Sequence, residues 1–152
     1  METKIVFIRF FVVFLLSSLF GMERQISRKP IGFGTYSFVT VGSCALGMAA
    51  LTIEPNNPLP LLGAIVTGIG FLGAGALIKT TDKIFGFTSA ASIWIFAIIG
   101  LLFGVGEYTL GFSTYGIVII IIAIDRFLEI KGIGSYQRKI TINTRKIVDK
   151  SE

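Results

Sequence analysis

The sequence IFGFTSAASIWIFAIIGLLFGVG occupies residues 84–106 and contains no charged side chain. A helix needs about 20 apolar residues to cross a bilayer, so this stretch is long enough to form a transmembrane helix. Outward from it, charged residues divide the chain into four more apolar segments. These are residues 5–22, which include Arg9, and residues 30–53, 55–78 and 108–124. We therefore expect an all-α fold, a polytopic transmembrane bundle of five helices.

The composition favours the same class of protein. Hydrophobic residues make up 53% of the chain and charged residues 15%, against about 25% charged residues in an ordinary soluble domain. So few polar side chains could not cover five apolar helices in water. The chain has no histidine and a single cysteine, which removes the usual catalytic base, the commonest zinc ligand and any internal disulfide. We predict that the protein is not an enzyme and holds neither a cofactor nor a metal ion.

The basic residues predict the orientation in the membrane. Twelve of the 14 lysines and arginines follow the first, the third or the fifth apolar segment. The loops after the second and fourth segments carry only Glu54 and Glu107. By the positive-inside rule, the N-terminus lies outside and the tail in the cytoplasm, with Lys4 as an exception. The net charge of +5 is then a topology signal, and nucleic-acid binding is not expected.

The C-terminal part of the chain, residues 132–152, is polar and basic. It is too short for a folded domain, so we expect a partly disordered cytoplasmic tail. Its basic residues could rest on anionic lipid, and the lipid bilayer is the first partner that the sequence predicts.

Small residues recur four positions apart in the third apolar segment. In lipid, helices associate by close backbone contact through such residues, so we expect tight helix packing here. A glycine-broken helix lining a substrate path is the alternative. Residues 68–73 also match the dinucleotide pattern GxGxxG, but they lie inside an uncharged apolar segment, so nucleotide binding is not expected. The residues predicted to pack are Gly63, Ala64, Thr67, Gly68, Gly70, Gly73, Ala74 and Gly75.

A few polar side chains fall within the predicted spans. Arg9 could extend to the outer interface or face the bundle interior. Trp94 lies near the middle of its segment, where its indole N–H needs a partner, and a helix–helix hydrogen bond is expected. Ser89 and Ser92, near the start of that segment, can cap the helix or bond back to its own carbonyl groups.

Three motifs resemble those of a known family. They are GIGFLGAG at residues 68–75, GFTSAASIW at residues 86–94 and GMERQ at residues 21–25. Together with Asp82 and with Arg9, fourteen residues before Glu23, they resemble the MgtC/SapB membrane proteins over about residues 5–125. Gly34 departs from the family, which usually has arginine there. The resemblance implies an MgtC/SapB-like transmembrane domain at residues 1–131, and the chain stops about where longer members carry a cytoplasmic C-terminal domain.

The resemblance also implies a function. Such a protein lies in the inner (plasma) membrane of a prokaryote and regulates or contacts other membrane machinery in magnesium homeostasis or low-magnesium adaptation. The expected partner is another membrane protein or a second copy of the chain. The alternative is a transporter or channel for magnesium or another ion, although magnesium prefers oxygen ligands such as carboxylates and the five segments contain no acidic residue. The functional candidates are Arg9, Glu23, Arg24, Asp82 and Trp94.

Overall fold

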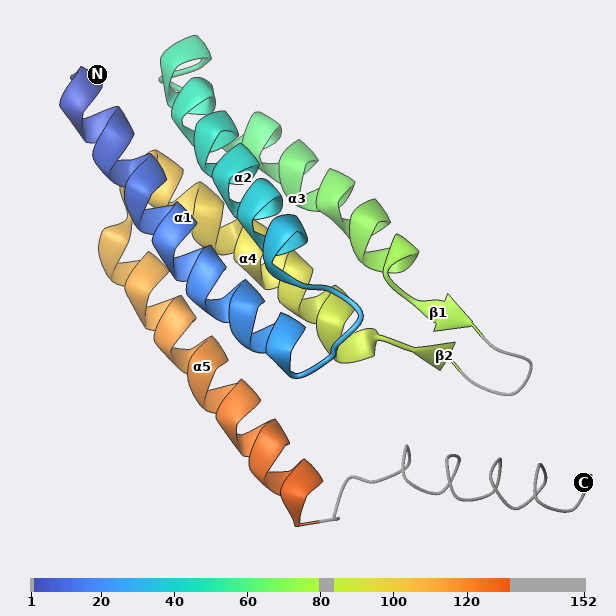
Figure 1. Cartoon of the computed structure of the whole chain (residues 1–152). Helices are drawn as coiled ribbons and strands as arrows, with labels where there is room; N and C mark the ends of the chain where they lie inside the picture. The colour runs from blue at the N-terminus through green and yellow to red at the C-terminus, as the bar shows by residue number, and fades with distance from the viewer. Residues whose placement is uncertain (1, 80–83, 132–152) are drawn as a thin grey trace, which may run out of the picture. The chain divides into compact units, whose positions relative to one another are not determined.

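The computed structural model describes residues 2–79 and 84–131. Contacts along the chain divide it into two compact units, one ending at Tyr115 and the other beginning at Gly116. The expectation of an all-α bundle with five helices is confirmed (Figure 1). The predicted tail, residues 132–152, and Asp82 lie outside the described residues. The helices are α1 (Thr3–Ile26), α2 (Phe33–Ile53), α3 (Leu59–Gly75), α4 (Phe87–Val105) and α5 (Tyr108–Ile130).

Between α3 and α4 lie two short strands, β1 (Ile78–Lys79) and β2 (Ile84–Phe85). They pair antiparallel, with residue 78 opposite residue 85 and residue 79 opposite residue 84. The predicted all-α fold included no strands. The strand pair brings the end of α3 next to the start of α4.

Proline and glycine explain where the helices begin and end. Pro58 precedes α3, and Pro60 occupies its first turn, where the missing N–H removes no helical hydrogen bond. Gly86 and Gly106 flank α4 with φ angles of +98° and +95°. These left-handed conformations favour glycine, and at Gly106 the backbone N–H bonds back to Leu102 O at 3.0 Å, which closes the helix.

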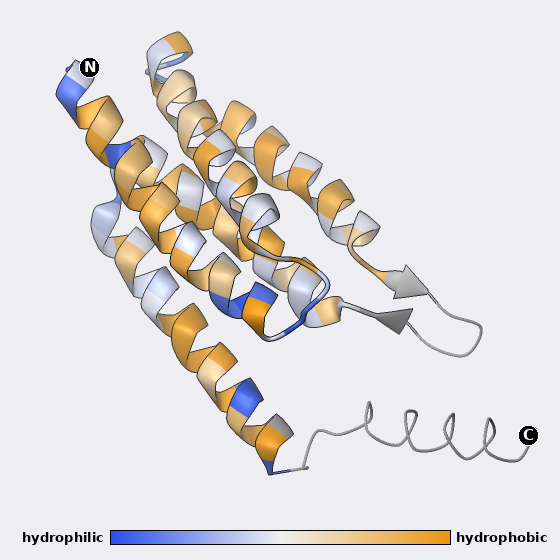
Figure 2. Cartoon of the chain, in the orientation of Figure 1, coloured by the Kyte–Doolittle hydropathy of each residue, from blue (hydrophilic) through white to orange (hydrophobic). Residues whose placement is uncertain are grey.

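Four helices, α1, α2, α4 and α5, are long and apolar enough to span a membrane. In Figure 2 hydrophobic residues run along these helices, and most hydrophilic residues lie near the helix ends. The third predicted segment covers residues 55–78, but its helix has 17 residues because the prolines delay its start. At 1.5 Å per residue it is about 25 Å long, near the lower limit for a span.

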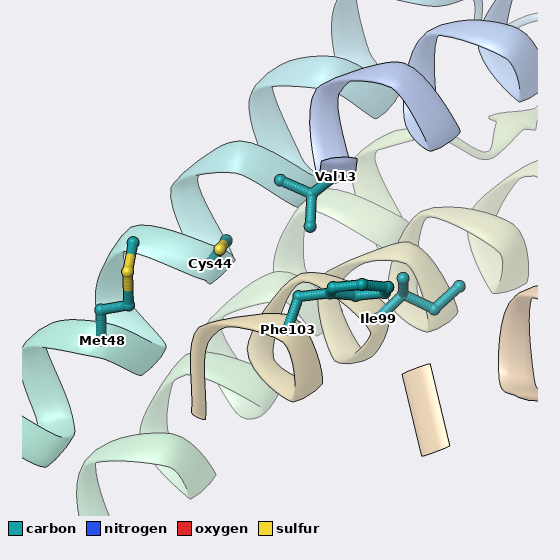
Figure 3. Packing of buried hydrophobic residues seen from close by; sticks show 5 residues of the cluster. All are labelled: Val13, Cys44, Met48, Ile99 and Phe103. Carbon is teal, nitrogen blue, oxygen red and sulfur yellow. The ribbon is translucent and has the colours of Figure 1, made fainter. Parts of the chain in front are cut away.

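In the unit that ends at Tyr115, α4 packs most extensively against α2, and α2 packs against α1. A cluster of buried residues from these three helices forms the core (Figure 3). The α2 and α4 backbones approach closely because glycines face the contact. A Cβ atom added at Gly104 would lie 2.5 Å from Cys44 O, and one at Gly100 would collide with Thr40 O. The core residues are Val13, Cys44, Met48, Ile99 and Phe103.

The small residues of α3 do not pack in the expected way within one chain. A Cβ atom added at Gly63, Gly68, Gly70 or Gly75 would meet no atom within 4 Å, and Ala64, Thr67 and Ala74 are exposed. Of the predicted packing residues only Gly73 is buried, with its added Cβ 3.5 Å from Ala90 O. The helix instead turns larger side chains toward its neighbours, and these partly buried residues are Leu61, Leu62, Ile65, Val66 and Ile69.

Candidate functional site

Arg24 is the largest buried polar side chain of the described residues, with 2% of its surface exposed. It lies in the last turn of α1, and its Nη2 donates to Ser89 Oγ, in the first turn of α4, at 3.4 Å. Its Nε is buried and has no hydrogen-bond partner among the described residues. The sequence named Arg24 as a functional candidate that follows the first apolar segment. The structure encloses the side chain within the bundle.

The polar cluster continues from Ser89 into α2. The hydroxyl groups of Tyr36 and Ser92 lie 2.6 Å apart. Ser92 donates its single hydrogen to Ser89 O at 3.0 Å, so the Tyr36 hydroxyl is the donor of the first bond. Arg24 also interacts electrostatically with the Tyr36 hydroxyl. We call Arg24, Tyr36, Ser89 and Ser92 the inner cluster; it joins α1, α2 and α4.

Aromatic rings pack against the Tyr36 ring of this cluster. The Phe20 and Phe96 rings lie 4.9 and 5.2 Å from the Tyr36 ring, measured between centroids. Buried polar groups are costly unless they are hydrogen-bonded. The cluster therefore ties the three helices into a defined arrangement.

The local sequence explains how α1 reaches this position. A Cβ atom added at Gly21 would lie 2.6 Å from Phe33 Cα, so only glycine permits this approach of α1 and α2. The C-terminus of α1 ends in a Schellman motif, with Lys29 N bonded to Arg24 O at 3.0 Å and Arg28 N to Gln25 O at 3.1 Å. Arg28 adopts a left-handed φ of 51°, a conformation that usually requires glycine.

Glu23 lies beside Arg24 in the same turn, partly exposed. Its Oε1 accepts a hydrogen bond from Ser27 Oγ at 2.7 Å, four residues further along the chain. Gln25, the third polar residue of the GMERQ motif, accepts a bond from the first N–H of α2, at Phe33, at 3.4 Å. The motif thus organises the α1–α2 connection as well as the inner cluster.

Arg9 forms a second polar contact near the other end of α1. Its Nε donates to the Tyr108 hydroxyl at 2.8 Å, and its Nη1 donates to Gly104 O. The guanidinium also lies over the Tyr108 ring, 5.5 Å from the centroid. Of the two sequence alternatives, Arg9 therefore adopts the one that faces the bundle. The helix separates it from Arg24 by about 22 Å at 1.5 Å per residue, so the two arginines belong to different sites.

Trp94 does not make the expected helix–helix hydrogen bond among the described residues, and 42% of its surface is exposed. The period of α4 explains this, because Ile93, Phe96 and Ala97 face the core and leave Trp94 on the outer side. Ser92 does bond back to its own helix, as the sequence suggested, but its bond to Tyr36 was not foreseen. A sequence signal for the α2–α4 contact was available in the GxxxG spacing of Gly100 and Gly104.

A metal site is not visible in the described part of the chain. Within residues 2–79 and 84–131, no group of three or more histidine, cysteine, aspartate or glutamate side chains is placed to hold a metal ion. The polar groups that the structure does bring together are donors and hydroxyls, which suit hydrogen bonding and the binding of anions.

Comparison with known proteins places these motifs in context. The sequence pattern that defines the MgtC family matches residues 10–130. Protein MgtC of Salmonella typhimurium is 36% identical over 94 residues, which are 62% of this chain and 41% of that protein. The Escherichia coli protein named "Putative magnesium transporter YhiD" is 30% identical over 135 residues, 81% of this chain and 60% of that protein.

An uncharacterized protein of Haemophilus influenzae is 34% identical over 113 residues, 67% of this chain and 48% of that protein. The chain therefore spans about half the length of these curated relatives. No solved structure matches the chain.

Proposed function

Because the chain belongs to the MgtC family and is a multi-pass membrane protein, we propose that it regulates other membrane machinery by direct contact, in magnesium homeostasis or low-magnesium adaptation. We place it in the plasma membrane of a prokaryote, with the N-terminus outside and the C-terminus in the cytoplasm. The proposal takes its link to magnesium from the family and from the name of YhiD. It does not require the protein to move ions itself.

The outward face of α3 is the observation that carries this proposal. Gly63, Gly68, Gly70 and Gly75 have open space where a side chain would be, and Thr67 bonds back to Gly63 O at 3.0 Å. A lipid-facing helix has no need of small residues, whereas a helix that docks on another helix does, because they allow the two backbones to approach. We therefore assign the small-residue face of α3 to a helix of a partner membrane protein.

The alternative is an ion transporter, favoured by the name of the YhiD relative. The two functions differ in what the purified protein does alone. Liposomes that contain only this protein should show no magnesium uptake above that of empty liposomes, measured with an entrapped magnesium-sensitive dye. Saturable uptake would favour the transporter and contradict the regulatory proposal.

The docking face is tested by copurification from native membranes in mild detergent. Gly70→Leu places a large side chain on the proposed face, and Gly42→Leu places the same side chain on α2 at another exposed glycine with no atom within 4 Å. We expect a membrane protein that copurifies with the wild type and with Gly42→Leu to be lost with Gly70→Leu. Equal recovery with both variants would contradict the assignment.

A further inference from the structure

The guanidinium of Arg24 faces the start of α4, and this arrangement brings positive groups together. Its Nη2 lies 3.4 Å from Ser89 Oγ in the first turn of α4. The N-cap residue Gly86 has no side chain to cap the helix, and the first turn contains no acidic residue. The first N–H groups of a helix lack partners in the helix, and its aligned peptide dipoles give this end a positive partial charge. A buried cation therefore lies against a positive helix end.

Negative groups also lie near Arg24. The C-terminal end of α1, where Arg24 lies, carries a negative partial charge, and Glu23 brings a carboxylate to the same turn. The Oε1 atom of that carboxylate accepts from Ser27 Oγ at 2.7 Å. The N–H donors of Arg24 are not all hydrogen-bonded within the described part of the chain. Its hydrogen bond to Ser89 Oγ is long, at 3.4 Å, and it also interacts with the Tyr36 hydroxyl, but its Nε, fully enclosed, has no partner among the described residues. A buried charged donor without a partner is costly, and more so in a membrane.

We propose that Arg24 and the first turn of α4 form a binding site for an anion of the phosphate class. Arginine side chains and helix N-termini are both common binding groups for such an anion. Gly86, directly before the helix, is left-handed, and a left-handed residue next to helical ones is the conformation that forms anion-binding nests of N–H groups. Phe87, at 62% exposure, and the exposed Thr88 leave this turn open from outside, while Arg24 reaches it from inside. The anion is supplied either by a phospholipid headgroup or by soluble phosphate.

The protein contains its own reporter for a binding experiment. Cys44 is its single cysteine and is fully buried. A dye that fluoresces on reaction with thiols therefore reports unfolding during a temperature ramp of the full chain in detergent. A ligand that binds only the folded protein raises the unfolding temperature by mass action. The first arm adds inorganic phosphate and compares it with chloride at equal ionic strength. The second arm adds phosphatidylglycerol and compares it with diacylglycerol, which lacks the phosphate.

We expect saturable stabilisation of the wild type in at least one arm. A higher unfolding temperature in both arms means that the site is open to soluble phosphate. A higher unfolding temperature with phosphatidylglycerol alone means that the site binds the headgroup of a lipid. Arg24→Gln should weaken the apparent affinity about tenfold or more, the effect of losing a hydrogen bond from a charged group. Arg28→Gln, which removes an exposed charge from the same connection, should leave the affinity unchanged.

Two results would overturn the site. One is the absence of stabilisation by both probes, and the other is equal affinity in Arg24→Gln and Arg28→Gln. If Arg24→Gln shows no cooperative unfolding, the affinity of Ser89→Ala is measured in its place. This variant removes one hydroxyl from the first turn of α4 and keeps the arginine. An affinity several-fold weaker supports the site, and wild-type affinity in Ser89→Ala rejects it. The outcome is independent of whether the protein regulates a partner.

Discussion

Arg9 illustrates how one residue within a membrane helix can be accommodated. Its two donor groups point to different elements, the Tyr108 hydroxyl at the start of α5 and Gly104 O near the end of α4. The turn between them is so tight that a Cβ atom at Gly106 would lie 3.0 Å from Arg9 Nη2. The planar guanidinium suits this contact because its donors lie at fixed angles. Arg9 therefore holds the α4–α5 turn against α1.

Arg9→Lys tests this role. A lysine keeps the charge but cannot reproduce the two divergent bonds, so we expect stability to fall by about 1–3 kcal/mol. The measurement is thermal unfolding in detergent, followed by Cys44 reactivity. Lys4→Gln, at an exposed position of the same helix, is the control and should change stability little. Equal effects of the two substitutions would mean that Arg9 only extends to the interface.

Arg28 offers a second test at the scale of a residue. Its φ of 51° is left-handed, where a residue with a Cβ atom is strained by roughly 1–2 kcal/mol and a β-branched residue by more. Arg28→Gly and Arg28→Val remove the same charge, so their difference isolates the backbone. We expect the glycine variant to be the more stable of the two by at least about 1 kcal/mol, measured in the same unfolding assay. A more stable valine variant would show that this turn has another conformation.

At the level of elements, the α2–α4 contact is the most extensive helix contact in this unit. Gly47, Gly100 and Gly104 remove the side chains that would separate the backbones. Such packing replaces the hydrophobic effect as a source of helix association in lipid. Small residues of α3 also recur four positions apart, but all of them except Gly73 are exposed, so the two sets should respond differently to substitution.

Gly104→Ala should therefore destabilise the protein by about 1–3 kcal/mol, because the new Cβ atom forces α2 and α4 apart. Gly70→Ala meets open space, and its gain in helix propensity of up to about 1 kcal/mol should leave stability unchanged or raised. Thermal unfolding of the two purified variants makes the comparison. If Gly70→Ala were the more damaging, α3 would pack through its small residues after all.

At the scale of the whole molecule, the length of α3 determines how the chain crosses the membrane. With 17 residues it is near the lower limit for a span. If α3 crosses, the basic residues after the first and third apolar segments share the cytoplasmic side with the tail. If it does not cross, the basic residues after the third apolar segment lie on the same side as the tail and opposite those that follow α1. Such a distribution contradicts the positive-inside rule. The charge pattern therefore favours five crossings.

Reporter fusions after Glu54 and after Lys139 distinguish the two topologies. With five crossings we expect the first fusion to report the outside and the second the cytoplasm. With four crossings both fusions would report the same side. An alkaline phosphatase and a fluorescent protein, fused in turn at each position, give opposite signals and serve as controls for each other.

The amino-acid sequence alone was enough to predict the class of protein, the number of helices and the family. Four apolar segments are uncharged over 17 or more residues, and the first is interrupted only by Arg9. Such segments must form helices in lipid, because no water is present to satisfy the backbone groups, and prolines and glycines mark their ends. The motifs at residues 21–25, 68–75 and 86–94 were sufficient to identify the family that the comparison confirmed. Each of these features is local and can be read from neighbouring residues.

Only the tertiary structure decided which faces of the helices meet. Gly70 and Gly104 stand in similar apolar surroundings along the chain, yet one faces outward and the other contacts α2. In the sequence Arg24 follows the first apolar segment, as an interfacial residue would. In the structure it is buried and contacts α4. The physical reason is that the rotation of a helix about its axis depends on all of its contacts at once. A helix that is apolar all round carries little record of that rotation in its own sequence.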